Sequence, residues 1–544
     1  MPRTQGQSKK VRRGRAPEPA PAPRFPEGTP QHWALAAILC AAFGLRIYNL
    51  ESIPIAGDES GYLRWAEIVV HQRQWFISLL DGKQPLGTWL QAAARVMLAD
   101  NPLFGARLVS VVAGSLSTLG IFAIGRRLGG DWAGFLAAIL YAVFPYALLY
   151  DRLAYMESLV NLSGVVVVYT SITHFDDTGG KWTRALVPGV ALGLGFFAKS
   201  TAVLFAFFPV AAGLWLARGR PQRLLLRLAV LYGVALLFPL VARVATPRAP
   251  MMQSHSLIVH QTSFFVAPAE LLRNPFVVAP ANVRQLGEYV GAYMTWPLAI
   301  AALAAAFYLG NRRSEAVMIV FAACWAPLLV QVFILQKLFP TRYPFPHLWP
   351  ALVILAMGAA RLRSRLRPAL TLLVVAAVAG PAVFQAFGVV QHPAEHLYAE
   401  DARMFLGSGP SAGFGIREAA EYLRAEARQG PLTVFTDAIW GSPADAMFIY
   451  LNERYGIRAY EAWWTSLGPN YPILPAAPVE ILKSQSEWVA AGTLDPAKLG
   501  RVYYVTETAY NPPAAVRLRQ PGARLLVSFP KPNGRNSIDV YRLR

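Results

Sequence analysis

Two adjacent carboxylates, Asp58 and Glu59, follow directly after the first strongly apolar segment of the chain, residues 33–50. A segment of roughly 20 apolar residues is long enough to cross a bilayer. A half-buried carboxylate at a membrane surface usually has a function, and it can accept a proton as a general base. Helix capping and the helix dipole are the structural alternatives. We favour catalysis for Asp58 and leave both roles open for Glu59.

Further ionisable residues interrupt or flank the later apolar segments. They are Lys83, Asp151, Arg152, Glu157, Lys199, His255, His260 and Arg342. A lysine inside an apolar run, such as Lys199, is costly unless it lines a polar cavity. The alternative is that long cationic side chains at span ends only extend to water. Asp151 and Arg152 are adjacent, and we expect them to form a local ion pair.

The composition indicates an integral membrane protein. Hydrophobic residues make up 55% of the 544 residues and charged residues 15%, and the mean hydropathy is +0.35. These values do not suit a soluble chain of this length. The net charge of +20 lies in a basic tail and in short loops between apolar runs, which is the positive-inside pattern. No nucleic-acid motif accompanies the charge, so we expect membrane lipids and no nucleic acid as partners.

Eleven membrane spans are predicted. They lie near residues 33–50, 103–125, 132–150, 155–174, 185–198, 201–217, 228–246, 289–309, 316–335, 345–360 and 368–389. With the N-terminus in the cytoplasm, eleven spans place every basic cluster on the cytoplasmic side of the membrane. The carboxylates and lysines named above then lie at the outer face. The tail, residues 1–31, is expected to be disordered, and the first span is expected to act as a signal anchor. Cys40 and Cys324 fall in spans, so no disulfide framework is expected.

The sequence changes character from about residue 391. Residues 415–428 and about 444–455 have helical patterns, and residues 432–436, 502–505 and 525–527 are short apolar strands. Alternating helices and strands indicate a small α/β domain with its own core, residues 391–544. The predicted topology places this domain outside the cytoplasm. We expect it to be dispensable for donor cleavage but not for the choice of acceptor.

Five segments along the chain carry a family resemblance. They are Asp58-Glu59, Gly82–Trp89, Arg152–Ser158, Gly193–Ser200 and Thr341–Pro346. In this order they resemble the GT-C glycosyltransferases that use lipid-phosphate sugars. The nearest groups are the protein O-mannosyltransferases of glycosyltransferase family 39 and the lipid A aminoarabinose transferases. The resemblance covers about residues 33–390.

The resemblance implies a fold and an activity. The fold is an α-helical polytopic membrane protein of GT-C type, with a transmembrane domain at residues 32–390 and the small C-terminal α/β domain outside. The activity is transfer of a sugar from a polyprenyl-phosphate donor to an extracytoplasmic acceptor, whether protein, lipid or glycan. The protein would lie in the plasma (inner) membrane. Asp58 matches the family's candidate base, and Glu59 completes the pair.

The same resemblance assigns the remaining site residues. Lys83, Lys199 and Arg342 would hold the donor phosphate, since cations stabilise a leaving phosphate. Glu157 aligns with a family aspartate, and Glu157, His255 and His260 are candidates for contact with the acceptor or a metal. The alternative for the two histidines is that they are plain surface residues of a loop. Gln84 replaces a proline of the family turn, and Gly82 replaces an acid that precedes the lysine in the lipid A enzymes. No cofactor is assigned, and a divalent metal stays open.

Two other classes of function remain as alternatives. A polytopic transporter or flippase of a lipid-linked or anionic substrate would also have many spans and intramembrane lysines. Such proteins commonly show inverted repeats and paired broken spans, which are not evident in this sequence. A scaffold or sensor that binds through the C-terminal domain would tolerate Asp58→Asn, whereas the enzyme would not.

Overall fold

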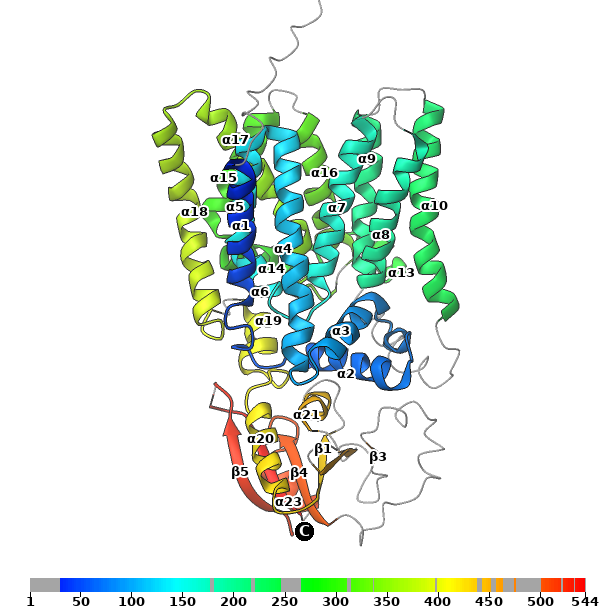
Figure 1. The fold of residues 1–544 in the computed structure, drawn as a ribbon, viewed down its shortest axis with the longest axis vertical. Helices are drawn as coiled ribbons and strands as arrows, with labels where there is room; N and C mark the ends of the chain where they lie inside the picture. Colours follow the sequence, from blue (N-terminus) through cyan, green and yellow to red (C-terminus); the bar gives the residue numbers. More distant parts are fainter. Residues whose placement is uncertain are drawn as a thin grey trace, which may run out of the picture.

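The computed structural model describes most of the chain. The described residues are 30–176, 181–216, 221–245, 266–310, 315–335, 337–396, 399–437, 443–451, 456–462, 474–475, 500–519, 522–532 and 534–543. Figure 1 shows a helical bundle at the top and a sheet at the bottom, with two helices, α2 (Gly57–Gln72) and α3 (Pro85–Met97), between them. His255 and His260 lie outside the described residues.

The helices of the bundle follow the apolar runs of the sequence. They are α1 (Pro30–Ile47), α4 (Pro102–Gly129), α5 (Asp131–Ala142), α6 (Pro145–Tyr150), α7 (Glu157–Asp176), α8 (Leu186–Ala198), α9 (Phe207–Leu216), α10 (Pro221–Ala245), α13 (Pro268–Arg273), α14 (Ala279–Tyr289), α15 (Trp296–Gly310), α16 (Glu315–Val330), α17 (Trp349–Arg363) and α18 (Pro368–Gln391). Short 3-10 or π turns join some of them: η1 (Ile77–Asp81), η2 (Trp182–Ala185), η3 (Ser200–Ala206), η4 (Val290–Met294), η5 (Gln331–Leu335) and η6 (Phe345–His347).

Several of these helices can cross a membrane. Within the described residues, five are long and apolar enough: α4, α7, α10, α17 and α18. The segments 279–294 and 296–310 would form a sixth span if they are one span bent by 104°. The chain is therefore a multi-pass membrane protein. The span predicted at 132–150 is broken, because Pro145 starts a new helix and disfavours helical backbone at the residue before it.

The helix that follows the two carboxylates is α2. It is preceded by Ala56 in an extended conformation, with φ −82° and ψ 160°. The backbone N–H of Ala56 donates to Glu59 Oε2 at 3.0 Å, which is the return bond of a capping box. Asp58 is therefore not the cap of this helix. Both acids lie in the first turn, where negative charge suits the helix dipole.

The C-terminal part of the chain forms a mixed six-stranded sheet. Its elements are α19 (Glu400–Ala402), η7 (Arg403–Ser408), α20 (Ile416–Ala427), β1 (Leu432–Asp437), α21 (Ala444–Tyr450), β2 (Ile457–Ala462), β3 (Leu474–Pro475), β4 (Arg501–Glu507), α23 (Pro513–Arg519), β5 (Arg524–Pro530) and β6 (Ser537–Arg542). The strand order is β3-β2-β1-β4-β6-β5. Strand β1 pairs in parallel with β2 and β4, whereas β6 pairs antiparallel with β4 and β5. The two helices and three strands expected from the sequence are all present, and β2, β3 and β6 were not expected.

The hydrophobic core of this sheet extends into the helical part of the molecule. Buried side chains from the sheet and from α20, such as Leu432 and Ile416, belong to one cluster with Ile55 and with Leu63 of α2. Leu103 of α4 belongs to the same cluster. The start of α2 is therefore packed between the bundle and the sheet, which fixes the helix that carries the two carboxylates.

Candidate active site

Asp58 faces a cation that comes from a distant segment. Nη1 of Arg342, in the loop before η6, donates a hydrogen bond to Asp58 Oδ2. The side chains of Arg342 and Asp58 are 16% and 15% exposed, so the pair is largely buried but still reachable. Two residues that the sequence named for different roles are thus in direct contact.

Glu157 connects this pair to a second cation. Glu157 starts α7, and its Oε1 accepts a hydrogen bond from Nζ of Lys199, the residue that follows α8. Nε of Arg342 lies 3.7 Å from the same oxygen. Asp58, Arg342, Glu157 and Lys199 therefore form a row of alternating charges. The structure brings together these four predicted site residues, although they come from four separate segments.

Lys83 supplies a third cation beside this row. It lies in the turn between η1 and α3, where its backbone N–H donates to the carbonyl of Ser78 at 3.0 Å. Its positive charge acts on both Asp58 and Tyr343. Lys83 forms no ion pair with any residue that the structure describes. Its ammonium group is therefore available to an incoming anion.

The electrostatics of the site keep its ion pair charged. Burial by itself raises the pKa of Asp58, but the positive charges of Arg342, Lys83 and Lys199 outweigh burial and leave that pKa below its usual value. For Arg342, burial acts to lower the pKa, but Asp58 and Glu157 more than offset it and hold the pKa well above its usual value. Three cations against two carboxylates leave one net positive charge, which suits a phosphodiester anion.

Aromatic rings line the cations. The Arg342 guanidinium carbon lies 5.4 Å from the ring centre of Tyr155 and 5.8 Å from that of Tyr343. Lys199 Nζ lies 4.6 Å from the centre of the Tyr343 ring. Tyr62 of α2 packs edge-on against Tyr155, with ring centres 6.4 Å apart. These rings attract the cations and exclude water, so charges in the site interact more strongly than they would in solvent.

Glu59 has a different environment from its neighbour Asp58. Its side chain is fully buried, and its two oxygens accept four hydrogen bonds. Arg107 donates two of them at 2.9 and 2.7 Å, and the backbone N–H groups of Ala154 and Ala56 donate at 2.6 and 3.0 Å. Every one of these partners belongs to the protein frame. Of the two roles that the sequence left open for Glu59, this geometry favours positioning of the helix over catalysis, and the catalytic role stays a prediction.

Arg107 was missed by the sequence analysis. It also donates to the backbone carbonyls of Leu50 and Ile53 at 2.8 and 2.7 Å, which ties the segment before α2 to α4. A signal for it exists in the sequence, because Arg107 falls inside the apolar run 103–125. A charged residue in such a run needs partners within the bundle.

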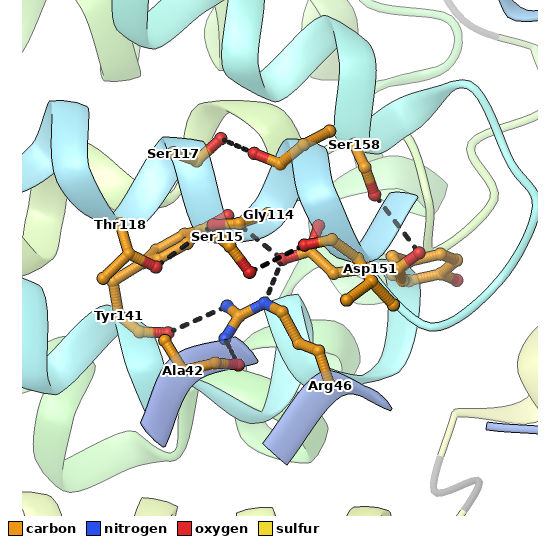
Figure 2. Close-up of polar contacts among 12 residues, drawn as sticks. Ala42, Arg46, Gly114, Ser115, Ser117, Thr118, Tyr141, Asp151 and Ser158 are labelled. Carbon is orange, nitrogen blue, oxygen red and sulfur yellow. Dashed lines mark hydrogen bonds and ion pairs between the residues drawn. The ribbon is translucent and has the colours of Figure 1, made fainter. Parts of the chain in front are cut away.

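Asp151 and Arg152 do not form the local pair that the sequence suggested. Asp151 Oδ2 accepts a hydrogen bond of 2.9 Å from Nε of Arg46, and both side chains are fully buried. Figure 2 shows the Arg46 guanidinium reaching Asp151 from α1. Arg152 instead donates to the backbone carbonyls of Tyr48 and Val389 at 2.8 Å each. Both residues therefore anchor the loop before α7, which carries Tyr155.

A metal ligand set is not evident in the described part of the chain. No group of three or more His, Cys, Asp or Glu side chains that could hold a metal ion is present there. The two histidines that the sequence proposed for acceptor or metal contact, His255 and His260, lie outside the described residues. Their roles stay predictions.

Two comparisons place the chain among known sequences. Residues 82–246 match the family model described as dolichyl-phosphate-mannose-protein mannosyltransferase. The undecaprenyl phosphate-alpha-4-amino-4-deoxy-L-arabinose arabinosyl transferase of Pseudomonas paraeruginosa is 32% identical over 185 residues, or 31% of this chain and 32% of that protein. Arabinosyl transferase 1 of Pseudomonas fluorescens is 30% identical over 185 residues, with the same coverage. The matching region spans about a third of these relatives.

Solved structures extend the likeness to nearly the whole chain. ArnT from Cupriavidus metallidurans bound to undecaprenyl phosphate superposes with a TM-score of 0.58 and 14% identity, covering 94% of this chain and 98% of ArnT. The chain has the GT-C fold. The Archaeoglobus fulgidus oligosaccharyltransferase in complex with Zn and sulfate gives a TM-score of 0.50 at 13% identity, over 93% of this chain and 72% of that one. The GT-C resemblance expected from five short motifs is confirmed.

Proposed function

We propose that this GT-C chain is a membrane glycosyltransferase that moves a sugar from a polyprenyl-phosphate donor to an extracytoplasmic acceptor. One observation carries the proposal: the carboxylate of Asp58 shares a largely buried site with Lys83, Lys199 and Arg342. Transfer from a lipid phosphate needs one base and a cluster of cations for the leaving group. The names of the matched arabinosyl transferases, which specify an undecaprenyl phosphate sugar, support this donor class.

The residues divide the reaction between a base and a phosphate site. Asp58 would accept the proton of an acceptor hydroxyl while the acceptor oxygen forms a bond to C1 of the sugar. The bond between C1 and the phosphate oxygen breaks, and its electron pair stays on that oxygen. Lys83, Lys199 and Arg342 would stabilise the extra negative charge of the departing polyprenyl phosphate.

Arg342 couples the two halves of this site. In the absence of donor its guanidinium donates to Asp58, which lowers the basicity of the carboxylate. A donor phosphate would compete for the same guanidinium, because a phosphate oxygen is an equally good acceptor for its N–H groups. Donor binding would then release Asp58 toward the acceptor. The base would be activated only when a donor is in place.

An apolar cavity supports a lipid carrier for the sugar. Its volume is about 330 Å³, and α14, α15, α16 and α17 line it. Leu348, which lines it, belongs to the same stretch of chain as Arg342 and immediately precedes α17. An apolar cavity in the bundle suits a polyprenyl chain, whose burial there is favourable.

In the proposed topology, the site lies at the extracytoplasmic face of the plasma (inner) membrane. Eleven spans, a cytoplasmic N-terminus and an extracytoplasmic C-terminal domain at residues 391–544 are parts of this proposal. Long apolar helices, one bent pair and shorter apolar helices coincide with the predicted spans, which supports it. Helices α4 and α17 both end on basic residues, which the positive-inside rule would assign to the cytoplasm, and this supports the proposed orientation.

A donor panel tests the proposed function. The purified full-length protein in liposomes is incubated with labelled polyprenyl-phosphate sugars, with nucleotide sugars as the matched comparison. We expect sugar release or transfer from at least one lipid-phosphate donor and none from nucleotide sugars. Transfer from a soluble nucleotide sugar without lipid carrier would overturn the donor class. Movement of intact donor across the bilayer without bond cleavage would favour a flippase.

A further inference from the structure

Another buried ion pair lies in the C-terminal part of the chain, outside the site described above. Lys531, directly after β5, places its Nζ 2.6 Å from Oε2 of Glu507, the last residue of β4. Both side chains are fully buried. A buried ion pair seldom adds net stability, because desolvation costs about as much as the pairing returns. The location of this pair therefore calls for another explanation.

The Lys531 ammonium also holds a segment of backbone. Nζ donates to the carbonyls of Gly409, Pro410 and Ala412 at 3.1, 3.0 and 2.7 Å. These residues lie between η7 and α20, where the chain leaves the bundle and enters the sheet. Burial lowers the pKa of Lys531 from its usual value, but Glu507 acts in the opposite direction. One ammonium thus fixes the conformation of the linker 409–413.

The linker in turn contacts the start of α2. The backbone N–H of Gly57 donates to the carbonyl of Ser411 at 2.9 Å. A Cβ on Gly413 would lie 1.9 Å from the carbonyl oxygen of Ile55, so no side chain fits between the linker and the residues that precede α2. Gly57 is the first residue of α2, and Asp58 is the second. The linker therefore holds the turn of helix from which Asp58 projects.

A second contact supports this connection. Nε of Arg64 in α2 lies 3.2 Å from Asp445 of α21, and the Arg64 guanidinium carbon lies 4.2 Å from the ring centre of Phe448. Figure 1 shows α21 just below α2. The linker thus contacts α2 at its start, and α21 contacts it in its middle.

We propose that Lys531 is a positioning residue for α2, which it holds in register with the phosphate site through the linker 409–413. The inference rests on the proposed function in one respect, the role of Asp58 as base. A positioning role for Lys531 is opposed to the expectation that the C-terminal domain is dispensable for donor cleavage. A truncation near Gln391 would remove the linker and uncover Ile55 and Leu63, which are buried in the core shared with the sheet.

Two variants and a matched control test the proposal. Lys531→Met with Glu507→Gln removes the ion pair without leaving a lone buried charge. Gly413→Ala pushes the linker away from Ile55 and leaves Lys531 intact. The control is Arg501→Met, because Arg501 of β4 also donates to backbone carbonyls, those of Glu426 in α20 and of Gly430, but has no hydrogen bond to the linker.

The readouts separate positioning from general stability. Hydrogen exchange of the amides of residues 55–60 reports on the start of α2 without any assay of activity. We expect exchange there to accelerate about tenfold or more in both variants and to stay unchanged in Arg501→Met. With a polyprenyl-phosphate sugar, kcat should fall about 10–100-fold because Asp58 is misplaced. The donor KM should change little, since the phosphate-binding cations do not lie on α2.

A covalent tether provides the rescue. A Cβ on Gly57 would lie 3.3 Å from Cβ of Ser411, close to the separation of a disulfide. Gly57→Cys with Ser411→Cys is built in the Lys531→Met/Glu507→Gln protein after replacement of Cys40 and Cys324 by Ser. Oxidation should restore slow exchange and kcat, and reduction should remove both again. Lys531→Arg, which keeps a buried donor group, should retain most of the activity.

Several outcomes would overturn the inference. Unchanged exchange of residues 55–60 in both folded variants would show that the linker does not hold α2. If Arg501→Met accelerated exchange of residues 55–60 and lowered kcat as much as the two variants, the effect would be a general one of the C-terminal domain. A further case is that the variants without the disulfide fail to fold while the disulfide-tethered protein folds. In that case, fast exchange of residues 55–60 or a low kcat in the oxidised tethered protein would also overturn the inference. A wild-type protein without transfer from any lipid donor would refute the proposed function, and the exchange result would still decide the positioning role.

Discussion

Arg342 donates a hydrogen bond to Asp58 although 284 residues separate them in the sequence. The contact joins the first helix after the first predicted span to the loop that enters α17. Arg342 also lies beside Glu157, which in turn binds Lys199. The proposed base and two of the proposed phosphate ligands, Arg342 and Lys199, are therefore parts of one ion-pair network, and a ligand that binds one of them affects the others.

Asp58→Asn should abolish turnover while the protein stays folded. The change keeps the shape of the side chain but removes its basicity, and loss of a general base costs about 10²–10⁴-fold in rate. Donor affinity, from equilibrium binding of the lipid donor, should stay within a few-fold or rise slightly, because the cations are intact and no carboxylate at position 58 competes for Arg342. The matched control is Glu67→Gln on the same helix, which pairs with Arg95 outside the site. Near wild-type turnover by Asp58→Asn would transfer the base role to Glu157.

The pH profile should differ between kcat/KM and kcat. In the free protein the nearby cations hold the pKa of Asp58 below its usual value, so the carboxylate stays ionised to low pH. A donor phosphate that draws Arg342 away and adds negative charge should raise this pKa. Activity falls in acid as Asp58 becomes protonated. The acid limb of kcat, which reports the donor complex, should therefore lie at higher pH than that of kcat/KM. Coincident limbs would argue against the exchange of Arg342.

Lys83→Ala and Lys199→Ala should have different effects. Lys83 has no ion pair with a described residue, so its removal should raise the donor KM about 10–100-fold and leave the melting temperature unchanged. Lys199→Ala should also lower the melting temperature, because it leaves the buried Glu157 without its ammonium partner. Lys337→Ala is the control, since Lys337 pairs with Glu270 away from the site. A Lys83→Ala protein with unaltered KM would show that Lys83 only reaches solvent.

Glu59→Gln should destabilise the protein, in contrast to Asp58→Asn. It leaves the fully buried guanidinium of Arg107 without its counter-charge. Removal of one partner of a buried ion pair costs about 3–5 kcal/mol. Thermal unfolding in detergent should therefore show a lower midpoint for Glu59→Gln than for Asp58→Asn. If Glu59→Gln were stable but inactive, Glu59 would be a catalytic residue after all.

Gly114→Ala should weaken the bundle at the Arg46–Asp151 pair. A Cβ at this position of α4 would lie 2.1 Å from Asp151 Oδ2 and 2.8 Å from Arg46 Nε, so the pair would have to separate. Gly44→Ala in α1 is the matched control, because a Cβ at that position would meet nothing within 4 Å and alanine favours a helix. The midpoint of thermal unfolding should be lower for Gly114→Ala than for the wild type and unchanged for Gly44→Ala. Equal midpoints would mean that the pair can shift without cost.

The sequence by itself determined the membrane class, the apolar helices, the GT-C resemblance and several elements of the sheet. Each of these follows from local information, because hydropathy, helical period and short motifs are properties of neighbouring residues. Membrane spans in particular are predictable, since a lipid environment requires every backbone polar group to be satisfied within a helix.

Only the tertiary structure decided which partner each charged residue has. Asp58 and Glu59 are adjacent acids of similar chemistry, and no local pattern separates them. Arg342 pairs with Asp58, which is partly exposed in the site. Arg107 pairs with Glu59, which is fully buried. The same holds for Asp151, whose partner Arg46 lies 105 residues away. The role of an ionisable group is set by the charges packed against it, and these come from segments that the sequence leaves far apart.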